Sequence, residues 1–424
     1  MNLGSINGLE SESSSGASLP KSGARKILII TLVPSHPTDH GNRSRLFRMV
    51  SALIDQGHEV HYLYIHREPS GDIAQMLAFW GDRLVLFDWL AMQKPTPATG
   101  VWDSVIQRVS LARIGLCYQL NKLLRRRMRV DDQYDDRLNP IITALHSRHR
   151  FDVVMVQYFF LTKALTLFDE TVTKVVDTID AFALRARNFR KRGATNDGGG
   201  WPISTNEERK GLQRADYVIG IQEEECRYFR SLSLRGRVVL VGHLTAIAKP
   251  VREPPEQIVL FVASDNWMNQ EALEWYLRHA HPVVRERFPE SQLWLCGNVG
   301  KTVAHLPDNV RVLGYVPDLS KIYPQAAVVI NPVQFGSGLA IKTIDALVAG
   351  RALVSTSCGV RGLGDHAGQA FELADDPVEF GLRVAALLAD PARRMSIAAM
   401  GRKLATNLNE QSLNELAAVI TANN

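Results

Sequence analysis

The sequence lacks the features of membrane-spanning, secreted and disulfide-bonded proteins. Its apolar runs all fall short of the roughly 18 residues that a membrane-spanning helix needs. The first residues show no basic segment followed by an apolar core, so we expect no secretory signal. Only four cysteines occur, far apart and without a Cys-x-x-Cys pair, which argues against a disulfide framework and a cysteine zinc site. We expect a cytoplasmic location.

Motifs of several enzyme classes are also missing. Residues 300–302 (GKT) resemble the end of a P-loop, but Leu295 occupies the position of its first glycine, which excludes a P-loop ATPase. No Gly-x-Gly-x-x-Gly follows the first strand, which argues against a nicotinamide dehydrogenase. No Asp-x-Asp pair is available to hold a nucleotide diphosphate through a metal, so we expect neither a metal nor another cofactor.

What the chain does contain is typical of a soluble protein with two domains. Hydrophobic residues make up 46% and charged residues 22% of the sequence, as in ordinary globular chains. Lys and Arg number 49 against 44 Asp and Glu, and the resulting charge of +5 is too weak to indicate nucleic-acid binding. The 424 residues exceed one ordinary core and suit two domains of about 200 residues each.

Short apolar, β-branched runs alternate with helical patterns along most of the chain. Each run is followed by a loop and an amphipathic stretch before the next run, which predicts successive β-α-β units and parallel sheets. We therefore expect an α/β fold of two Rossmann-like, doubly wound domains that face each other across a cleft. The predicted strands lie within residues 26–33, 60–65, 151–159, 174–182, 215–222, 238–243, 258–264, 292–298, 310–316, 326–333 and 351–357.

Composition also suggests where the domains begin and end. The Ser- and Gly-rich start has too few large apolar groups to offset its ordering entropy and is expected to be disordered. Three prolines among charged residues mark a linker in the middle of the chain. The expected segments are a tail (1–24), a first domain (25–245), the linker (246–257), a second domain (258–405) and a helix that packs back on the first domain (406–424).

The most informative segment is residues 331–362, NPVQFGSGLAIKTIDALVAGRALVSTSCGVRG. A strand ends there, residues 336–338 (GSG) form a tight turn, and a helix follows. Small residues let the backbone approach a ligand, and a helix start offers unpaired N–H groups to an anion. Lys342, about one turn into the helix, can direct its charge at a diphosphate, and Asp345 can accept hydrogen bonds from a ribose. A surface turn with a solvated lysine fits the spacing equally well.

This segment resembles the signature of family-4-type glycosyltransferases with the GT-B fold, the glycosyl transferases group 1. Residues 345–350 (DALVAG), followed by 352–356 (ALVST), match the second half of that signature. Residues 314–319 resemble the loop that stacks on the donor base, and residues 261–269 resemble the first turn of the donor domain. The resemblance therefore implies a GT-B fold with the donor site in the second domain.

The resemblance also implies roles for individual residues. Lys342 stands where several members place a diphosphate-binding cation, and Asp345 replaces the second Glu of the family's E-x7-E frame, which contacts the ribose. Ser337 replaces the first Glu, which contacts the transferred sugar, so the sugar and the stereochemical outcome stay open. The donor-binding residues expected on this basis are Asn266, Asn269, Gly297, Tyr315, Val316, Gly336, Ser337, Gly338, Leu339, Lys342 and Asp345.

Candidates in the first domain lie at the ends of its strands, where α/β sites form. Arg43 can pair with a phosphate of the donor or of a lipid-linked acceptor, or it can be a solvated first-turn residue. Asp180 can accept the acceptor's proton or cap the helix that follows it. His243 fits an interdomain contact better than catalysis. The expected catalytic residues are Asp180, Lys342 and Arg43, and the expected acceptor-side residues are Gly41, Asn42 and His243.

Residues 108–129 interleave leucines and isoleucine with several cations. Such an amphipathic basic helix can lie on an anionic membrane, or it can be an ordinary helix with a solvated charged face. Members of the family that use polyprenyl acceptors commonly carry such a patch. The segment therefore raises the expectation of peripheral contact with the inner face of the plasma membrane.

The sequence thus predicts a glycosyltransferase of the hexosyltransferase type. It would move a sugar from a nucleotide diphosphate sugar to a hydroxyl of a polysaccharide or lipid-linked glycan precursor, without a metal. Retention of configuration is the family expectation, and inversion with Asp180 as base stays open. Two alternatives are a nucleotide-sugar epimerase of the same fold and a non-catalytic scaffold that binds sugar nucleotides.

Overall fold

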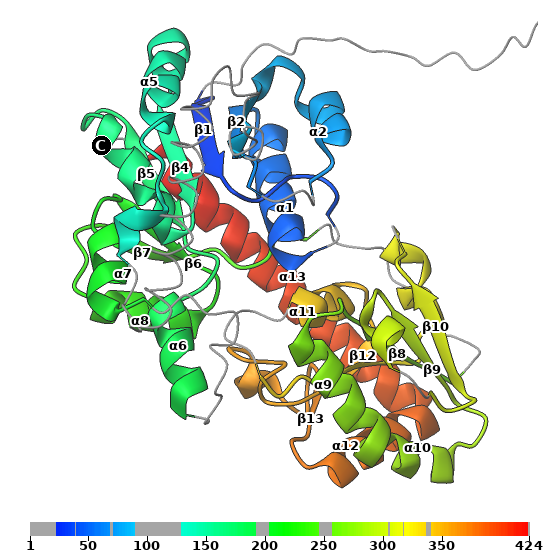
Figure 1. The fold of residues 1–424 in the computed structure, drawn as a ribbon. Helices are drawn as coiled ribbons and strands as arrows, with labels where there is room; N and C mark the ends of the chain where they lie inside the picture. The colour runs from blue at the N-terminus through cyan, green and yellow to red at the C-terminus, as the bar shows by residue number, and fades with distance from the viewer. Residues whose placement is uncertain are drawn as a thin grey trace, which may run out of the picture.

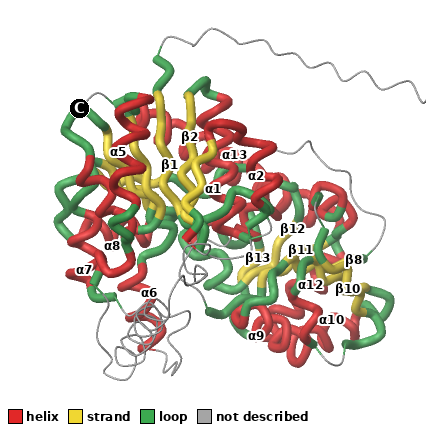
Figure 2. The backbone as a smooth tube through the Cα atoms, turned by 45° about the horizontal axis from the view of Figure 1, so that its top comes forward, coloured by secondary structure: helices red, strands yellow, loops and turns green. Residues whose placement is uncertain are grey.

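A computed structural model describes most of the chain as two α/β lobes (Figure 1). Each lobe is built around one parallel sheet, and Figure 2 shows the strands of each lobe flanked by helices. The predicted fold of two Rossmann-like domains is therefore confirmed. The described residues are 23–38, 40–67, 71–89, 129–191, 203–245, 257–303, 306–316, 318–335 and 341–422.

The first lobe contains a seven-stranded sheet in the order β3-β2-β1-β4-β5-β6-β7. Its inner strands are apolar runs buried on both faces, which is the pattern of a parallel sheet covered by helices. The strands are β1 (Lys26–Thr31), β2 (Glu59–Ile65), β3 (Leu84–Phe87), β4 (Val153–Gln157), β5 (Thr173–Asp177), β6 (Tyr217–Gly220) and β7 (Arg237–Leu240). The helices are α1 (Gly41–Asp55), α2 (Ile73–Trp80), α5 (Leu138–His149), α6 (Phe182–Lys191), α7 (Thr205–Leu212) and α8 (Glu223–Ser231).

The second lobe contains a six-stranded sheet in the order β10-β9-β8-β11-β12-β13. A π-helical stretch, Tyr276–Ala280, connects α9 (Trp267–Trp275) directly to α10 (His281–Arg287), so the three segments form one continuous helix. The strands are β8 (Ile258–Val262), β9 (Gln292–Cys296), β10 (Val310–Gly314), β11 (Val328–Asn331), β12 (Ala352–Ser355) and β13 (Glu372–Leu373). The helices are α9 (Trp267–Trp275), α10 (His281–Arg287), α11 (Ile341–Val348) and α12 (Pro377–Ala389).

One long helix, α13 (Pro391–Thr421), runs from the second lobe to the first (Figure 1). Its last turns bury Leu416, Val419 and Ile420 in the core cluster that lies beneath α1. The Ser412 hydroxyl accepts a hydrogen bond from the backbone N–H of Gly242, at 3.0 Å. The expected end of the second domain at residue 405 therefore falls inside a single helix, α13, which contacts both lobes.

The strand orders place a topological switch point in each sheet. In the first sheet, the order in which successive strands are added changes side between β1 and β4. In the second sheet, it changes side between β8 and β11. Loops at the carboxyl ends of such a strand pair diverge to opposite sides and leave a crevice where α/β proteins bind ligands. We therefore expect a ligand-binding site at these two crevices.

Candidate functional site

A side-chain hydrogen bond spans each switch point. In the first lobe, the Asn42 amide donates to the Tyr158 hydroxyl at 3.2 Å, joining the start of α1 to the end of β4. In the second lobe, the Lys342 ammonium donates to Asn269 Oδ1 at 2.5 Å, joining the start of α11 to α9. Three of these four residues were expected site residues, and the fold brings them to the two crevices.

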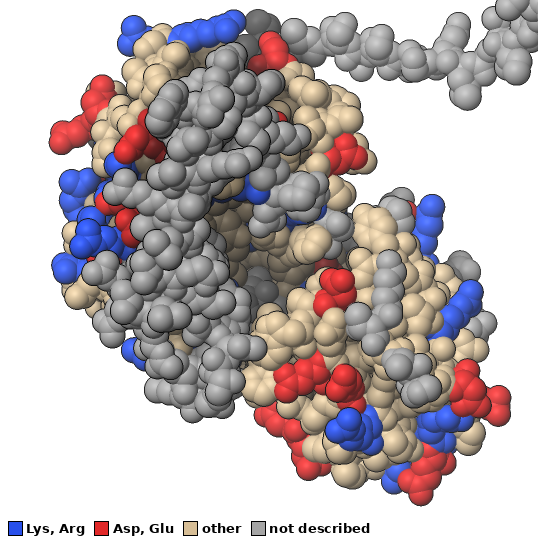
Figure 3. All heavy atoms as spheres, viewed as in Figure 1, with Lys and Arg blue, Asp and Glu red and all other residues tan. Residues whose placement is uncertain are grey.

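The two crevices face each other, because the amino ends of α1 and α11 meet. A Cβ added to Gly41, the first residue of α1, would stand 3.1 Å from Cδ1 of Ile341, the first described residue of α11. Helix amino ends carry unpaired N–H groups and a partial positive charge, and both attract anions. Figure 3 shows that the molecular surface is hollowed between the lobes. The arrangement directs two helix dipoles at this recess.

Lys342 lies at the second switch point, where its side chain reaches Asn269 of α9. It is the second described residue of α11, and the expected turn before the helix lies outside the described residues. Its ammonium lies 5.2 Å from the centre of the Phe261 ring. Burial lowers the pKa of Lys342 to about 7. The amine is therefore held ready to gain a proton when an anion arrives.

Asp345 lies close to the other lobe. Its Oδ1 is 3.6 Å from Nε2 of His243, which follows β7 and is buried. The carboxylate is 31% exposed, so it keeps room for a further hydrogen bond. His243 thus makes the interdomain contact that its place in the sequence favoured, and it positions the carboxylate that the resemblance assigns to a ribose.

The second lobe also contains a pocket of about 310 Å³ at the ends of β11 and β12. Arg361 in its lining lies 3.6 Å from Glu224 in the first turn of α8, so the pocket borders the first lobe. The sequence interpretation included this stretch in the signature but assigned it no role. The residues that line the pocket are Gln334, Ser357, Cys358, Arg361 and Asp375.

Two further expected donor residues organise the loop after β8. The Asn266 side chain caps α9 by accepting a hydrogen bond from the Asn269 backbone, at 3.0 Å. Gly297 has φ +93°, and a Cβ there would stand 2.2 Å from the carbonyl oxygen of Ala263. Any other residue would collide with this backbone, so Gly297 fixes the loops after β8 and β9 against each other.

The expected base-stacking residues follow β10, the outermost strand of the second sheet. Tyr315 is 51% exposed, and Val316 packs partly against the core. An aromatic pair follows the two strands that flank the crevice: the rings of Trp267, after β8, and Phe335, after β11, are 6.1 Å apart. Gly336, Ser337, Gly338 and Leu339 lie outside the described residues, as do residues 108–128 of the basic segment.

Asp180 lies at the carboxyl edge of the first sheet. It is buried, and its Oδ2 forms an ion pair with Arg185 of α6 at 2.5 Å. The preceding residue, Ile179, has φ +60°, and Tyr158 after β4 has φ +64°. A β-branched residue in this region is strained by about 1–3 kcal/mol. Such strain gathers at functional loops, and both strained residues are at the edge that borders the recess.

Two buried glutamates, rather than Asp180 alone, surround the amino end of α6. Glu208 accepts hydrogen bonds from the Tyr228 hydroxyl at 2.7 Å and from the Ala183 backbone at 3.3 Å. Burial raises the pKa of Glu208 to about 7. Burial, together with the nearby charge of Asp180, raises the pKa of Glu225 well above its usual range. Sequence reasoning missed both, because glutamates on charged helical stretches are usually solvated.

Glu208 should make folding stability depend on pH. Its pKa is higher in the folded chain, so its contribution is complete below about pH 4.5 and is lost as the pH rises through about 7. We expect Glu208→Gln to be the more stable protein at pH 8, by on the order of 3 kcal/mol, and the difference to vanish at pH 4.5. Urea unfolding at both pH values tests this, with Glu286→Gln, an exposed carboxyl, as the control. Equal stability of Glu208→Gln and wild type at pH 8 would contradict it.

A buried polar network joins β1, β4, β5, the segment after β7 and α1 at the same edge. Arg45 lies between Asp177, at 2.8 Å, and the carbonyl oxygen of Gly242, at 2.5 Å. Gln157 donates to Asp177 and accepts from Thr31. The network holds the start of α1, and with it the recess, in a fixed orientation.

Arg43 is also buried, at 5% exposure, so the alternative of a solvated first-turn residue is wrong. It lies in the first turn of α1, two residues after Gly41 at the helix start that faces α11. The guanidinium is thus carried by the helix end that borders the recess.

The second lobe is similar in sequence to known proteins. Residues 256–390 match the family model of glycosyl transferases group 1. A protein of Klebsiella pneumoniae, described as an uncharacterized 44.6 kDa protein in the cps region, is 31% identical over 127 residues. That match covers 27% of this chain and 33% of the relative, so the chain aligns with about a third of the relative's length.

Solved structures extend the likeness to nearly the whole chain. Anabaena HepE, crystallised with UDP and glucose, is 13% identical with a TM-score of 0.58, and the match covers 91% of this chain and 98% of HepE. A variant of S. aureus TarM, crystallised with fondaparinux, α-GlcNAc-glycerol and UDP, is 10% identical with a TM-score of 0.62, covering 92% and 99%. At these identities the likeness establishes the GT-B fold.

Among the described residues, no helix is long and apolar enough to cross a membrane.

Proposed function

We propose that this chain, a GT-B-fold protein whose residues 256–390 form a glycosyl transferases group 1 domain, transfers a sugar from a nucleotide diphosphate sugar to a hydroxyl group. The second lobe would bind the donor and the first lobe the acceptor. The observation that carries the proposal is the position of Lys342, which bonds to Asn269 across the switch point between β8 and β11 and follows Ile341, the residue of α11 that lies beside Gly41 of α1. The cation and the two helix ends converge where a diphosphate would lie.

The chemistry follows from this convergence. When the bond between the sugar and the diphosphate breaks, negative charge develops on the departing diphosphate. Lys342, Arg43 and the helix N–H groups are held in place before the reaction, and such fixed donors stabilise developing charge more effectively than water does. We propose that these groups act without a metal ion.

The donor's nucleotide is proposed to be UDP, since HepE and TarM were crystallised with it. Asp345, positioned by His243, would accept hydrogen bonds from the ribose. Trp267 and Phe335 offer aromatic surface beside the crevice, and Tyr315 offers it at the end of β10. Ser337 replaces the family's sugar-contacting Glu, so retention, the family expectation, needs its own test.

The acceptor is proposed to be a hydroxyl of a growing polysaccharide or its lipid-linked precursor. The relative from the cps region supports this class. Residues 108–129 would bring the cytoplasmic enzyme to the inner face of the membrane that carries such an acceptor. Asp180 is proposed to take the hydroxyl proton, which requires Arg185 to move off its carboxylate when the acceptor binds.

Incubation of the purified chain with UDP-, GDP- and dTDP-sugars tests the proposal. We expect binding of one nucleotide class by calorimetry and slow release of its nucleoside diphosphate, accelerated by an acceptor extract. Asp180→Asn should bind the donor normally and lose the acceleration. Isomerised sugar without release would indicate the epimerase, and binding without any turnover would indicate the scaffold. Absence of binding to all three classes would contradict the proposed donor site.

A further inference from the structure

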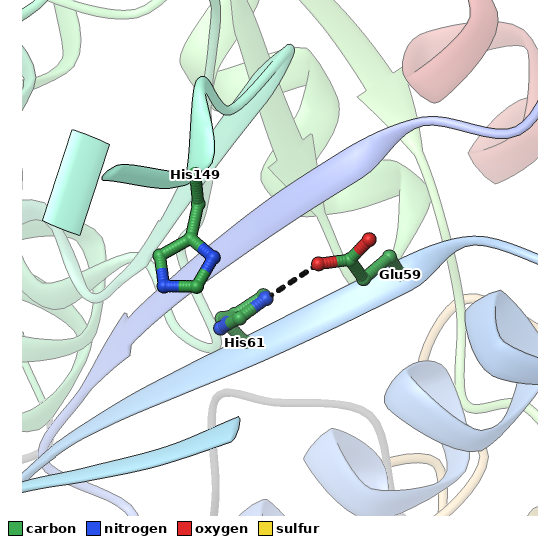
Figure 4. Close-up of side chains that lie close together, drawn as sticks. All are labelled: Glu59, His61 and His149. Carbon is green, nitrogen blue, oxygen red and sulfur yellow. Dashed lines mark hydrogen bonds and ion pairs between the residues drawn. The ribbon is translucent and has the colours of Figure 1, made fainter. Parts of the chain in front are cut away.

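Three metal-ligating side chains converge at the edge of the first sheet opposite the recess (Figure 4). Glu59 and His61 are alternate residues at the start of β2, so their side chains project from the same face of the strand. His149 is the last residue of α5, which packs on that face. Their ligand atoms all lie within 4.8 Å of one another.

The surrounding contacts already hold these side chains together. His61 Nε2 is 2.8 Å from Glu59 Oε1. The rings of His61 and His149 have centroids 4.2 Å apart and planes inclined by 50°. The Phe151 ring packs against both histidines, at 5.3 and 5.6 Å. His61 is buried, whereas the Glu59 side chain is 44% exposed, so the cluster is enclosed on one side and open to solvent on the other.

We propose that Glu59, His61 and His149 form a binding site for one divalent transition-metal ion, with Zn²⁺ as the best fit. Two imidazole nitrogens and a carboxylate oxygen are a ligand set that Zn²⁺ accepts and that Mg²⁺ and Ca²⁺ do not favour. Zinc bonds of about 2.0–2.1 Å in a tetrahedron bring ligand atoms to about 3.3 Å from one another. Rotation of the half-buried His149 ring closes the remaining gap, and a water molecule would complete the coordination.

A nearby cation competes with the metal without blocking it. The Lys26 ammonium is 3.9 Å from Glu59 Oε2, whereas His61 contacts Oε1. The Lys26 side chain is 46% exposed, so it can turn into solvent when a divalent ion arrives. The ion would replace the hydrogen bond between Glu59 and His61 and bind to the same atoms.

The position of the site points to a structural role. Glu59 begins β2, and a seven-residue strand extends about 23 Å towards the carboxyl edge, where the recess lies. An ion at Glu59 is therefore too far from the recess to touch a reacting sugar. It would instead fasten the end of α5 to β2. The site is consequently independent of the proposed metal-free sugar transfer.

Calorimetry of the full-length, metal-free protein with ZnCl2 tests the site. We expect one Zn²⁺ per chain, with affinity lowered at least about tenfold in His149→Ala and in Glu59→Gln. His366→Ala removes an exposed histidine from the other lobe and should bind as wild type does. Cys358→Ser removes a half-buried cysteine and should also bind normally. Zinc should raise the melting temperature of wild type but not of the two ligand variants.

Either of two results would overturn the proposal. One is absence of stoichiometric Zn²⁺ binding to wild type. The other is loss of binding in Cys358→Ser with retention in His149→Ala and Glu59→Gln. Melting curves of the metal-free variants show whether they fold, and Glu59→Gln, which alters a half-exposed side chain, remains informative if His149→Ala does not fold.

Discussion

Lys342→Ala is expected to weaken UDP binding by about 10- to 100-fold while leaving the binding of uridine nearly unchanged. A hydrogen bond to a charged group contributes about 1.5–3 kcal/mol, which corresponds to this range of affinity. Lys342 follows Ile341, the residue of α11 that lies beside the start of α1, where the diphosphate is proposed to bind, whereas uridine has no phosphate to contact it. Calorimetric titration with both ligands measures the two effects separately.

Lys342→Arg is the matched variant, because it keeps the charge and should retain most of the affinity. Burial lowers the pKa of Lys342 to about 7, so near neutral pH a share of the wild-type molecules holds a neutral amine. An arriving diphosphate favours the charged form, and wild type should take up part of a proton on binding UDP. Titrations in buffers of different ionisation enthalpy detect this uptake, which should be absent in Lys342→Arg. Unchanged UDP affinity in Lys342→Ala would move the donor site elsewhere.

Most of the strands that sequence analysis predicted are buried on both faces, although the predicted edge strands β7 and β10 are partly exposed. In β1, β4, β8 and β12 nearly every side chain is covered, so the apolar run itself marks the strand. The edge strand β13 was missed because it has only two residues. The edge strand β3 was also missed, although its four residues are all apolar and it is no more exposed than β10, which was predicted.

For the candidate site, sequence analysis predicted individual residues but not the contacts between them. Sequence analysis singled out Lys342, Asn269 and Asp345 from the resemblance and His243 from its place after a strand, but it could not show which of them touch. Lys342 meets Asn269 across 73 residues of sequence, and this pairing depends on the order of β8 and β11 in the sheet. A strand order is a property of the folded chain, so local patterns do not reveal such pairs.

Sequence analysis did not identify Arg45 as a buried, ion-paired residue. It precedes the apolar stripe of α1, where a cation is usually solvated, and nothing local distinguishes it from Arg48, which is exposed. Its partner Asp177 lies 132 residues further along the chain. The metal-ligating cluster was missed for the same reason: Glu59 and His61 are close in sequence, but His149 reaches them only through the packing of α5.

Asp177→Ala is expected to lower the free energy of unfolding by about 3–5 kcal/mol, the largest stability loss that we predict. Asp177 is fully buried, and Arg45 is 3% exposed. Without the carboxylate, the guanidinium would remain buried with its charge uncompensated, and Gln157 would lose an acceptor. Urea unfolding measures the loss. Asp308→Ala, which removes an 87% exposed carboxylate paired with Arg285, should leave the unfolding midpoint unchanged.

The double variant Arg45→Met/Asp177→Leu separates loss of the ion pair from loss of packing. Apolar residues of similar size can replace a buried ion pair at little cost, because the desolvation penalty disappears together with the attraction. We therefore expect the double variant to recover part of the stability that Asp177→Ala loses, although the carbonyl of Gly242 would still lack its donor. If the double variant is less stable than Asp177→Ala, the pair stabilises the fold beyond its desolvation cost. An Asp177→Ala protein as stable as wild type would show that Arg45 reaches solvent or another anion in the folded chain.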